Sequence, residues 1–143
     1  MSHFFTLVLI PRDTKNVEEA VERLLAPYDE NLPNNTSPKW DWWRIGGRWN
    51  GRVMGRPRDS EDGYNFGPEY SRLEENMAPV TALPEDLVPF AIVTPDGKWR
   101  GRGEMRWFGI AVNMKPSDEW ISEVKRILEA HQDCIAVGCD LHI

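Results

Sequence analysis

The sequence predicts an α+β fold of the ferredoxin-like, split βαβ type, and three observations support that class. Four apolar segments of strand length and two amphipathic helical segments follow one another in the order strand, helix, strand, strand, helix, strand. A segment without regular periodicity, at about residues 29–86, separates the first helix from the second strand and is interpreted as an insertion. The length of 143 residues with 41% apolar content fits one globular domain. We therefore expect a single domain over residues 1–143, with an antiparallel sheet and both helices on one of its faces.

The first part of the chain contributes one strand and one helix. Residues 3–10, HFFTLVLI, are rich in β-branched and aromatic side chains and end at Pro11, as a buried strand would. A helix should follow, because apolar residues recur at helical spacing and acidic residues crowd its first half, where the helix dipole favours them. The apolar set is Val17, Ala20, Val21, Leu24, Leu25 and Tyr28.

The second part supplies the remaining elements. Residues 88–94, VPFAIVT, form the second expected strand and are closed by the turn sequence Pro-Asp-Gly at 95–97. Residues 105–114 form the third strand, so the two strands would make a hairpin with a long basic tip. A second amphipathic helix begins near residue 117, and residues 134–143 are the fourth strand.

Strand alternation then assigns side chains to faces of the sheet. In the expected topology the first and third strands are central, and the fourth flanks the first. The helices would cover Phe5, Leu7 and Leu9, while the even-numbered residues of the first strand face the open side. Small residues beside that open side leave a shallow apolar groove, which needs a cover. The Trp-rich part of the insertion is the candidate for that cover.

Four of the seven tryptophans lie within ten residues and are interleaved with Gly-Arg pairs. Glycines at this density make a helix costly, so a twisted loop or an irregular hairpin is expected over residues 40–55. In one interpretation the arginines and backbone amides hold an anion while a tryptophan stacks on a base. In the other, the tryptophans form a lid over the sheet, and the arginines stack on them or pair with Asp41 and other local acids. The candidate binding residues of this segment and of the hairpin are Trp42, Trp43, Arg44, Arg48, Trp49, Arg52, Trp99, Arg100, Arg102 and Trp107.

The net charge of −6 is unevenly distributed. Residues 39–58 hold six basic side chains against Asp41, and residues 98–106 hold four against Glu104, so two basic islands lie in an otherwise acidic protein. The acidic surface argues against binding of long DNA, because counterion release needs a continuous basic footprint. A local patch of arginine and tryptophan can still hold a nucleotide or a short RNA.

The ends of the first and last strands suggest a small polar site. His3 should lie opposite the end of the last strand, close to Asp140 and His142. These three residues are a candidate acid–base or polar edge site, with a hydrogen-bonded terminal histidine as the simpler alternative. By strand alternation, His3 is assigned to the other face of the sheet from Asp140 and His142.

The tail also carries His131, Cys134 and Cys139, whose spacing with His142 resembles that of zinc ligands. Successive strand residues point to opposite faces, so these side chains do not converge, and we expect no metal and no cofactor. The same alternation disfavours a disulfide, and both cysteines are expected as reduced, buried thiols.

Two further classes of protein, membrane or secreted proteins and enzymes, find no support in the sequence. Residues 3–10 are too short to cross a membrane and lack the features of a secretory signal, so we expect a cytoplasmic protein without a membrane partner. No segment resembles a nucleophile elbow, a phosphate-binding loop or a dinucleotide fingerprint, which leaves an enzyme unsupported.

Three short segments resemble a group of proteins. They are WDWWRIGGRWNG at 40–51, TPDGKWRGRGEM at 94–105 and CDLHI at 139–143. They are similar to segments of uncharacterised small proteins carried by bacteriophages and by actinobacterial or mobile genomes, which share a W-D-W-x-x-I-G-G-R-W core. The resemblance implies a small phage-type accessory protein of the host cytoplasm, and it provides no catalytic residues to carry over.

The sequence leaves three functions open. The first is binding of a host or defence protein through the Trp/Arg-rich insertion and the basic hairpin tip at Trp99, Arg100 and Arg102. The second is a pocket for a nucleotide or a short RNA, with arginine on phosphate and tryptophan stacking on the base. The third is a small hydrolase or transferase that uses the edge at Asp140 and His142.

Overall fold

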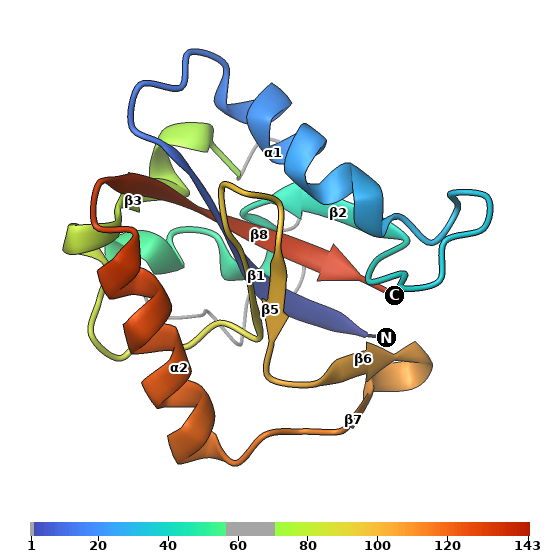
Figure 1. The fold of residues 1–143 in the computed structure, drawn as a ribbon. Coiled ribbons are helices and arrows are strands. Elements are labelled where there is room, and N and C mark those ends of the chain that lie inside the picture. The colour runs from blue at the N-terminus through green and yellow to red at the C-terminus, as the bar shows by residue number, and fades with distance from the viewer. Residues whose placement is uncertain (1, 57–70) are drawn as a thin grey trace.

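The computed structural model describes residues 2–56 and 71–143 and has an α+β fold (Figure 1). Its centre is a long antiparallel pair, β1 (His3–Pro11) and β8 (Cys134–His142). The two strands pair over their whole length, from His3↔His142 to Pro11↔Cys134. This pairing brings the two ends of the chain together at one end of the sheet (Figure 1).

Six shorter strands complete the β structure of the described residues. They are β2 (Trp42–Ile45), β3 (Met77–Pro79), β4 (Ala91–Val93), β5 (Trp99–Gly101), β6 (Glu104–Arg106) and β7 (Ile110–Val112). The main sheet has the order β2-β8-β1-β4-β5, with β3 also paired to β8, while β6 and β7 form a separate hairpin. β4 runs parallel to β1, and the other described pairs are antiparallel, so the sheet is mostly antiparallel.

The expected hairpin of residues 88–94 with residues 105–114 is wrong. β4 turns back at once and pairs with β5, and Gly97, at a φ of +86°, donates its N–H to the Thr94 carbonyl oxygen at 2.8 Å. Residues 105–114 are not one strand, because the chain turns at Phe108, whose φ is +64°, and β7 folds back on β6. Short loops close at a smaller entropic cost than long ones, which favours pairing between neighbouring segments. The parallel neighbour of β1 is therefore β4, and the strand order expected for a ferredoxin-like sheet is not observed.

The two helices, α1 (Val17–Leu25) and α2 (Ser117–Ala130), cover opposite faces of the sheet, which corrects the expectation that both lie on one face. One core cluster joins α1 to Phe4, Val8 and Ile10, and the other joins α2 to Phe5, Leu7 and Leu9. Figure 1 shows α1 above the β1–β8 pair and α2 below it. The cause lies in β1, where every residue from Phe4 to Ile10 is buried, so both faces of the strand need a cover.

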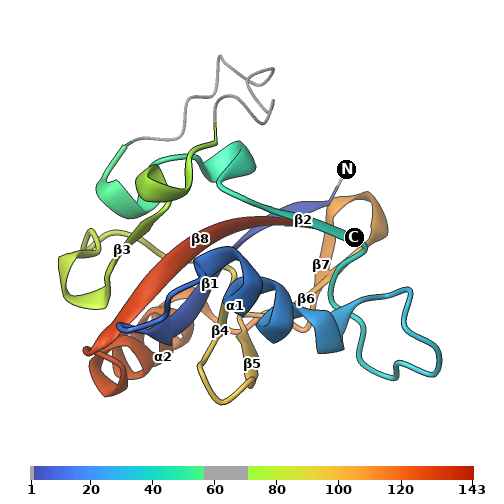
Figure 2. The same cartoon turned by 90° about the horizontal axis from the view of Figure 1, so that it is seen from above.

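Several described residues of the 29–86 segment are packed into the two core clusters. Trp40 is buried beside α1 and donates its indole N–H to the Leu25 carbonyl oxygen at 2.9 Å. Short 3₁₀ turns at Gly47–Trp49 and Arg52–Met54 lie on the other side of the sheet (Figure 2), where Val53 is buried in the α2 cluster. Residues 57–70 of the expected insertion lie outside the described residues.

Cys134 and Cys139 are free, buried thiols, as strand alternation predicted. Their burial raises the pKa of both groups above the ordinary value of a cysteine. Within residues 2–56 and 71–143, no helix is both long enough and apolar enough to span a bilayer.

Candidate functional site

The candidate site lies at the end of the sheet where β1 begins and β8 ends. His142 pairs with His3 on one side and with Trp42 on the other, so these three residues form a row across β1, β8 and β2. In the next row, Asp140 pairs with Phe5 and Arg44. Directly opposed residues of neighbouring strands share a face. The assignment of His3 to the other face from Asp140 and His142 is therefore wrong, because the antiparallel register pairs odd residues of β1 with even residues of β8.

Each histidine in this row is oriented by its own carboxylate. His3 Nδ1 lies 2.7 Å from Asp140 Oδ1, and His142 Nδ1 lies 2.7 Å from Asp41 Oδ1. Because a carboxylate oxygen accepts, Nδ1 carries the proton in both rings, and Nε2 is the basic nitrogen of the neutral imidazole. The two rings touch edge to face, with centroids 4.9 Å apart and an interplanar angle of 70°. We call His3, Asp140, His142 and Asp41 the paired-histidine site.

Asp140 is the most deeply placed member of the site, with 1% of its surface exposed. Its Oδ2 accepts the backbone N–H of Arg48 at 3.1 Å, so the carboxylate is bonded on both oxygens. The chain can approach this closely only through Gly47, which has a φ of +57° and whose missing side chain would collide with Asp140. A buried carboxylate with two donors provides a rigid acceptor for the His3 ring.

The turn that carries Gly47 and Arg48 is itself fixed to the sheet. Trp49 stacks on Phe5, with ring centroids 5.8 Å apart and an interplanar angle of 10°. Asn76 is fully buried and accepts the Gly51 N–H at 2.9 Å through its side-chain oxygen. These contacts hold the turn against Asp140 and, through it, the orientation of His3.

Burial lowers the pKa of His3 below the ordinary value of 6.5. The hydrogen bond and the charge of Asp140 act in the opposite direction, while the charges of Arg48 and His142 add to the lowering. His3 is therefore held mainly as the neutral imidazole at neutral pH, with Nε2 able to accept a proton.

Trp42 adds an aromatic surface at the open side of the row. Its side chain is 42% exposed, and its ring meets the His3 ring edge to face at 5.7 Å between centroids. Arg44 and Arg48 are partly exposed side chains of the same end of the sheet. The end of the sheet thus combines an aromatic plane, two guanidinium groups and two imidazoles, which are donors and stacking partners for an anionic ring compound.

Among the described residues, no group of three or more histidine, cysteine or acidic side chains is placed to hold a metal ion. Comparison of the chain with protein-family models, curated proteins and solved structures finds no match. The site must therefore be interpreted from its own geometry and chemistry.

The other residues expected to bind a ligand do not join the paired-histidine site. Trp43 packs against the core on the α1 side, and Trp99 packs there with Tyr28 at 5.2 Å between ring centroids. Arg102 donates from Nε to the Lys115 carbonyl oxygen at 3.1 Å, so it stabilises the chain locally. Arg52 lies in a 3₁₀ turn and contacts the Arg56 carbonyl oxygen, Arg100 is exposed on β5, and the side chain of Trp107 is outside what the structure describes.

Sequence reasoning missed Asp41, which completes the second histidine–carboxylate pair. The residue lies beside Trp42 in the W-D-W motif and was considered as an acid within a basic island that could pair with the arginines, not as a partner of His142. Its backbone N–H donates to the His142 carbonyl oxygen at 2.8 Å, which places its carboxylate beside the His142 ring. A search for acids next to the aromatic motif could have marked it, although its partner depends on the register of β2 against β8.

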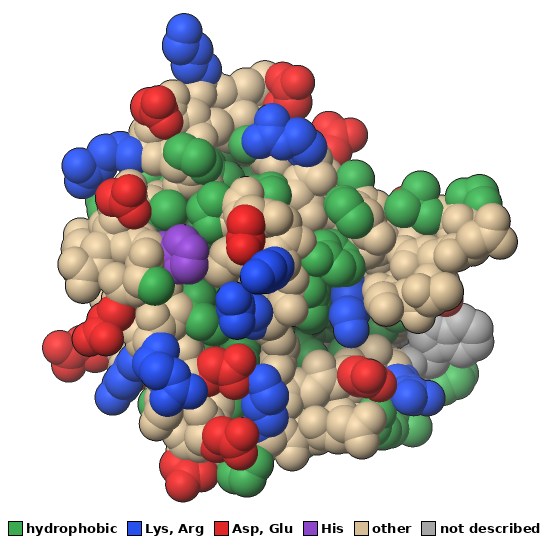
Figure 3. Space-filling view, in the orientation of Figure 1, with side chains coloured by type: hydrophobic (Ala, Val, Ile, Leu, Met, Phe, Trp, Pro, Cys, Tyr) green, Lys and Arg blue, Asp and Glu red, His purple; other side chains and the backbone are tan. Residues whose placement is uncertain are grey.

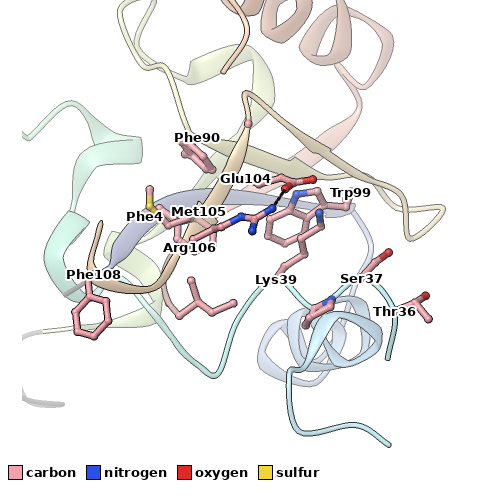
Figure 4. Close-up of a pocket in the computed structure, with 13 residues that line it drawn as sticks. Phe4, Thr36, Ser37, Lys39, Phe90, Trp99, Glu104, Met105, Arg106 and Phe108 are labelled. Carbon is pink, nitrogen blue, oxygen red and sulfur yellow. Dashed lines mark hydrogen bonds and ion pairs between the residues drawn. The ribbon is translucent and has the colours of Figure 1, made fainter. Parts of the chain in front are cut away.

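A concave region lies away from the paired-histidine site, on the α1 side of the sheet (Figure 4). This cavity of about 680 Å³ has aromatic and apolar walls together with Lys39 and the ion pair of Arg106 with Glu104, 3.2 Å apart. The apolar lining residues are Phe4, Pro38, Phe90, Trp99, Met105, Phe108 and Ile143. The space-filling view shows hydrophobic side chains in a hollow beside β5, with acidic and basic side chains interspersed over the surrounding face (Figure 3).

Proposed function

We propose that the protein binds a nucleotide or a short single-stranded RNA at the paired-histidine site. The observation that carries this proposal is the contact of two carboxylate-oriented imidazoles, His3 and His142, beside the half-exposed ring of Trp42. The Nδ1 atoms are engaged by Asp140 and Asp41, so the Nε2 atoms are the groups available to a ligand.

The chemistry of the surrounding side chains favours an anionic ring compound. Guanidinium groups pair with phosphate oxygens through parallel N–H donors, and Arg44 and Arg48 supply such groups at this end of the sheet. A base can stack on the exposed face of Trp42, an interaction that contributes about 1–3 kcal/mol per base. The net charge of −6 disfavours long nucleic acids, so the ligand should be short.

Fluorescence anisotropy with a labelled 2′-O-methyl tetranucleotide tests the proposal, because this probe binds like RNA but cannot be cleaved. We expect Trp42→Ala to weaken binding by about 5- to 150-fold, the range that corresponds to loss of one stacking contact. Arg48→Ala should also weaken binding, and this loss of affinity should be larger at low salt than at high salt. Arg126→Ala is the matched control, since Arg126 is an exposed arginine of α2. Equal affinity of all these variants would contradict the proposal.

The second candidate function is binding of a host or defence protein, as in a phage-type accessory protein of the host cytoplasm. The observation that favours it is the β6–β7 hairpin, where Phe108 is 87% exposed and Ile110 is 56% exposed beside the cavity of Figure 4. Exposed apolar side chains grouped at one place are typical of protein contact surfaces. Immobilised protein should retain a specific host protein, and Phe108→Ser should release that protein while Met54→Ser, at another exposed apolar residue, should not.

A further inference from the structure

The two imidazoles of the paired-histidine site are arranged as separate proton carriers. A single histidine bonded to a carboxylate is common in folded proteins, but here two such pairs use different carboxylates and their rings meet. Asp140 holds His3 and Asp41 holds His142 through Nδ1, so each ring keeps its own orientation and leaves Nε2 as its second nitrogen. Two imidazoles in contact, each with its Nε2 not engaged by its carboxylate, provide one group to remove a proton and another to donate one.

The surroundings of the two rings differ in the way that an acid–base pair requires. The His3 side chain is 13% exposed and is bonded to a carboxylate that is 1% exposed. His142 is 23% exposed and is bonded to Asp41, which is 32% exposed. Burial lowers the pKa of His3, and the charges of Arg48 and His142 lower it further, so His3 is the ring held neutral and able to accept a proton.

A substrate that carries its own nucleophile needs little more than such a pair. RNA has a 2′-hydroxyl group next to each phosphodiester, and its attack on phosphorus requires a base for the 2′-hydroxyl proton and an acid for the leaving oxygen. The backbone N–H of Arg48 is bonded to Asp140 and the charge of its guanidinium group acts on His3, so this group can stabilise the extra negative charge on the phosphoryl oxygens.

We propose that the protein cleaves short single-stranded RNA by transesterification, with His3 as the base and His142 as the acid. This inference rests on the proposed binding of short RNA at the same site. His3 Nε2 takes the proton of the 2′-hydroxyl group, the bond from O2′ to phosphorus forms, and the bond from phosphorus to O5′ breaks. His142 enters the step as the imidazolium, with protons on both nitrogens, donates its Nε2 proton to O5′ and is left neutral. The products are a 2′,3′-cyclic phosphate and a free 5′-hydroxyl end, without any oxidant, reductant or further reactant.

Asp140 and Asp41 act as positioning residues in this scheme. Each fixes the proton on Nδ1 of its histidine and thereby leaves Nε2 as the nitrogen that exchanges protons with substrate. In this scheme Trp42 stacks on the face of a base next to the cleaved bond. Because every base has such a face, cleavage should require a single-stranded substrate but should depend little on its sequence.

The test uses a fluorophore–quencher oligonucleotide of DNA that contains one ribonucleotide, with an all-DNA oligonucleotide as its chemical control. The protein should cleave only the first, and mass spectrometry should find the cyclic phosphate. His3→Asn and His142→Asn should each reduce the rate by about 100-fold or more, the usual contribution of a positioned acid or base. His131→Asn, which alters the remaining histidine at the end of α2, should leave the rate unchanged. Asp41→Asn should shift the pH profile of the rate, which a purely structural role would not do.

The outcomes separate this inference from the proposed function. Binding of the 2′-O-methyl probe without cleavage of the ribonucleotide substrate would overturn the cleavage inference and leave the binding proposal intact. Absence of both binding and cleavage would overturn both. Cleavage that persists equally in His3→Asn and His142→Asn would identify a contaminating nuclease and overturn the inference as well. Thermal unfolding of each variant, followed by circular dichroism, confirms that the compared proteins are folded.

Discussion

The side-chain oxygen of Asn76 accepts the backbone N–H of Gly51 at 2.9 Å, and this bond ties the Trp/Arg-rich turns to the strand region beside β8. Asn76 also donates to Asn50 Oδ1 at 2.8 Å and to the Arg72 carbonyl oxygen at 2.7 Å, while its own carbonyl oxygen accepts the Gly138 N–H at 2.8 Å. The fully buried side chain of Asn76 thus bonds the turns at residues 50 and 51 and the carbonyl oxygen of residue 72, while the Asn76 backbone bonds β8.

Asn76→Ala should lower the free energy of unfolding by about 1–3 kcal/mol, because it leaves the Gly51 N–H buried without its acceptor. Urea titration measures this change. Asn31→Ala is the control, since Asn31 is exposed and its side chain bonds only the nearby Asp29, so its effect should stay within about 0.5 kcal/mol. Similar effects of the two variants would show that Asn76 does not fix the turns.

Gly47→Ala should be more destabilising than Gly97→Ala. Both glycines have a positive φ, +57° and +86°, so each alanine variant carries the backbone strain of about 1 kcal/mol or more. A methyl group at Gly47 would also collide with the Asp140 carboxylate, whereas one at Gly97 meets nothing within 4 Å. Urea denaturation of both variants measures their free energies of unfolding and separates the effect of backbone strain from that of the collision. Equal losses of stability in the two variants would mean that a side chain at position 47 does not collide with Asp140.

Stability should decrease as the pH falls through the range just below 6.5. His3 has a lowered pKa in the folded protein, so between that pKa and the ordinary 6.5 the unfolded chain binds more protons than the folded chain. The free energy of unfolding therefore rises with pH in this window. The groups that face His3 are Asp140 and His142 of β8 and Arg48 of the adjacent turn, and burial sets the net direction.

Unfolding in urea between about pH 5 and about pH 8 measures this dependence. His3→Asn should flatten the slope of stability against pH below 6.5, because the shifted group is gone. His131→Asn, at the C-terminal end of α2, should leave that slope in place. A slope that is unchanged in His3→Asn would assign the pH dependence to other groups.

Trp120→Ala should lower the free energy of unfolding by about 3–5 kcal/mol, as expected for removal of a large core side chain. Trp120 is 1% exposed, and its indole N–H donates to the Pro89 carbonyl oxygen at 2.7 Å, which joins α2 to the chain before β4. Trp42→Ala serves as the matched variant, because Trp42 is 42% exposed and should matter for ligand binding more than for stability. A larger loss of stability in Trp42→Ala than in Trp120→Ala would contradict the assignment of Trp120 to the core and of Trp42 to the binding site.

Much of the fold could be predicted from local patterns. The expected strand at 3–10 and the expected helix beginning at Val17 correspond to β1 and α1, and the expected strand at 134–143 corresponds to β8. These elements are long and strongly periodic or apolar, so the residues within each one define it. The strands of three or four residues, such as β2 and β3, have no such pattern and exist because they pair with β8.

The candidate site was predicted in part. The sequence indicated that His3, Asp140 and His142 would meet at the strand ends, since the first and last strands were expected to be neighbours. It did not indicate Asp41, and it assigned His3 to the wrong face, because a change of register by one residue moves every side chain of a strand to the opposite face. Register depends on contacts along the whole pair, which no local segment contains.

By itself, the sequence determined where β1, α1, α2 and β8 lie, which side chains are apolar and that the Trp/Arg-rich segment could not be a helix. These properties follow from composition and spacing within single segments. Only the tertiary structure decided that β4 lies beside β1, that the helices cover opposite faces and that Asp41 and Asp140 each orient one histidine. The physical reason is that strand pairing and burial are chosen by the free energy of the whole chain, in which segments far apart in sequence compete for the same partners.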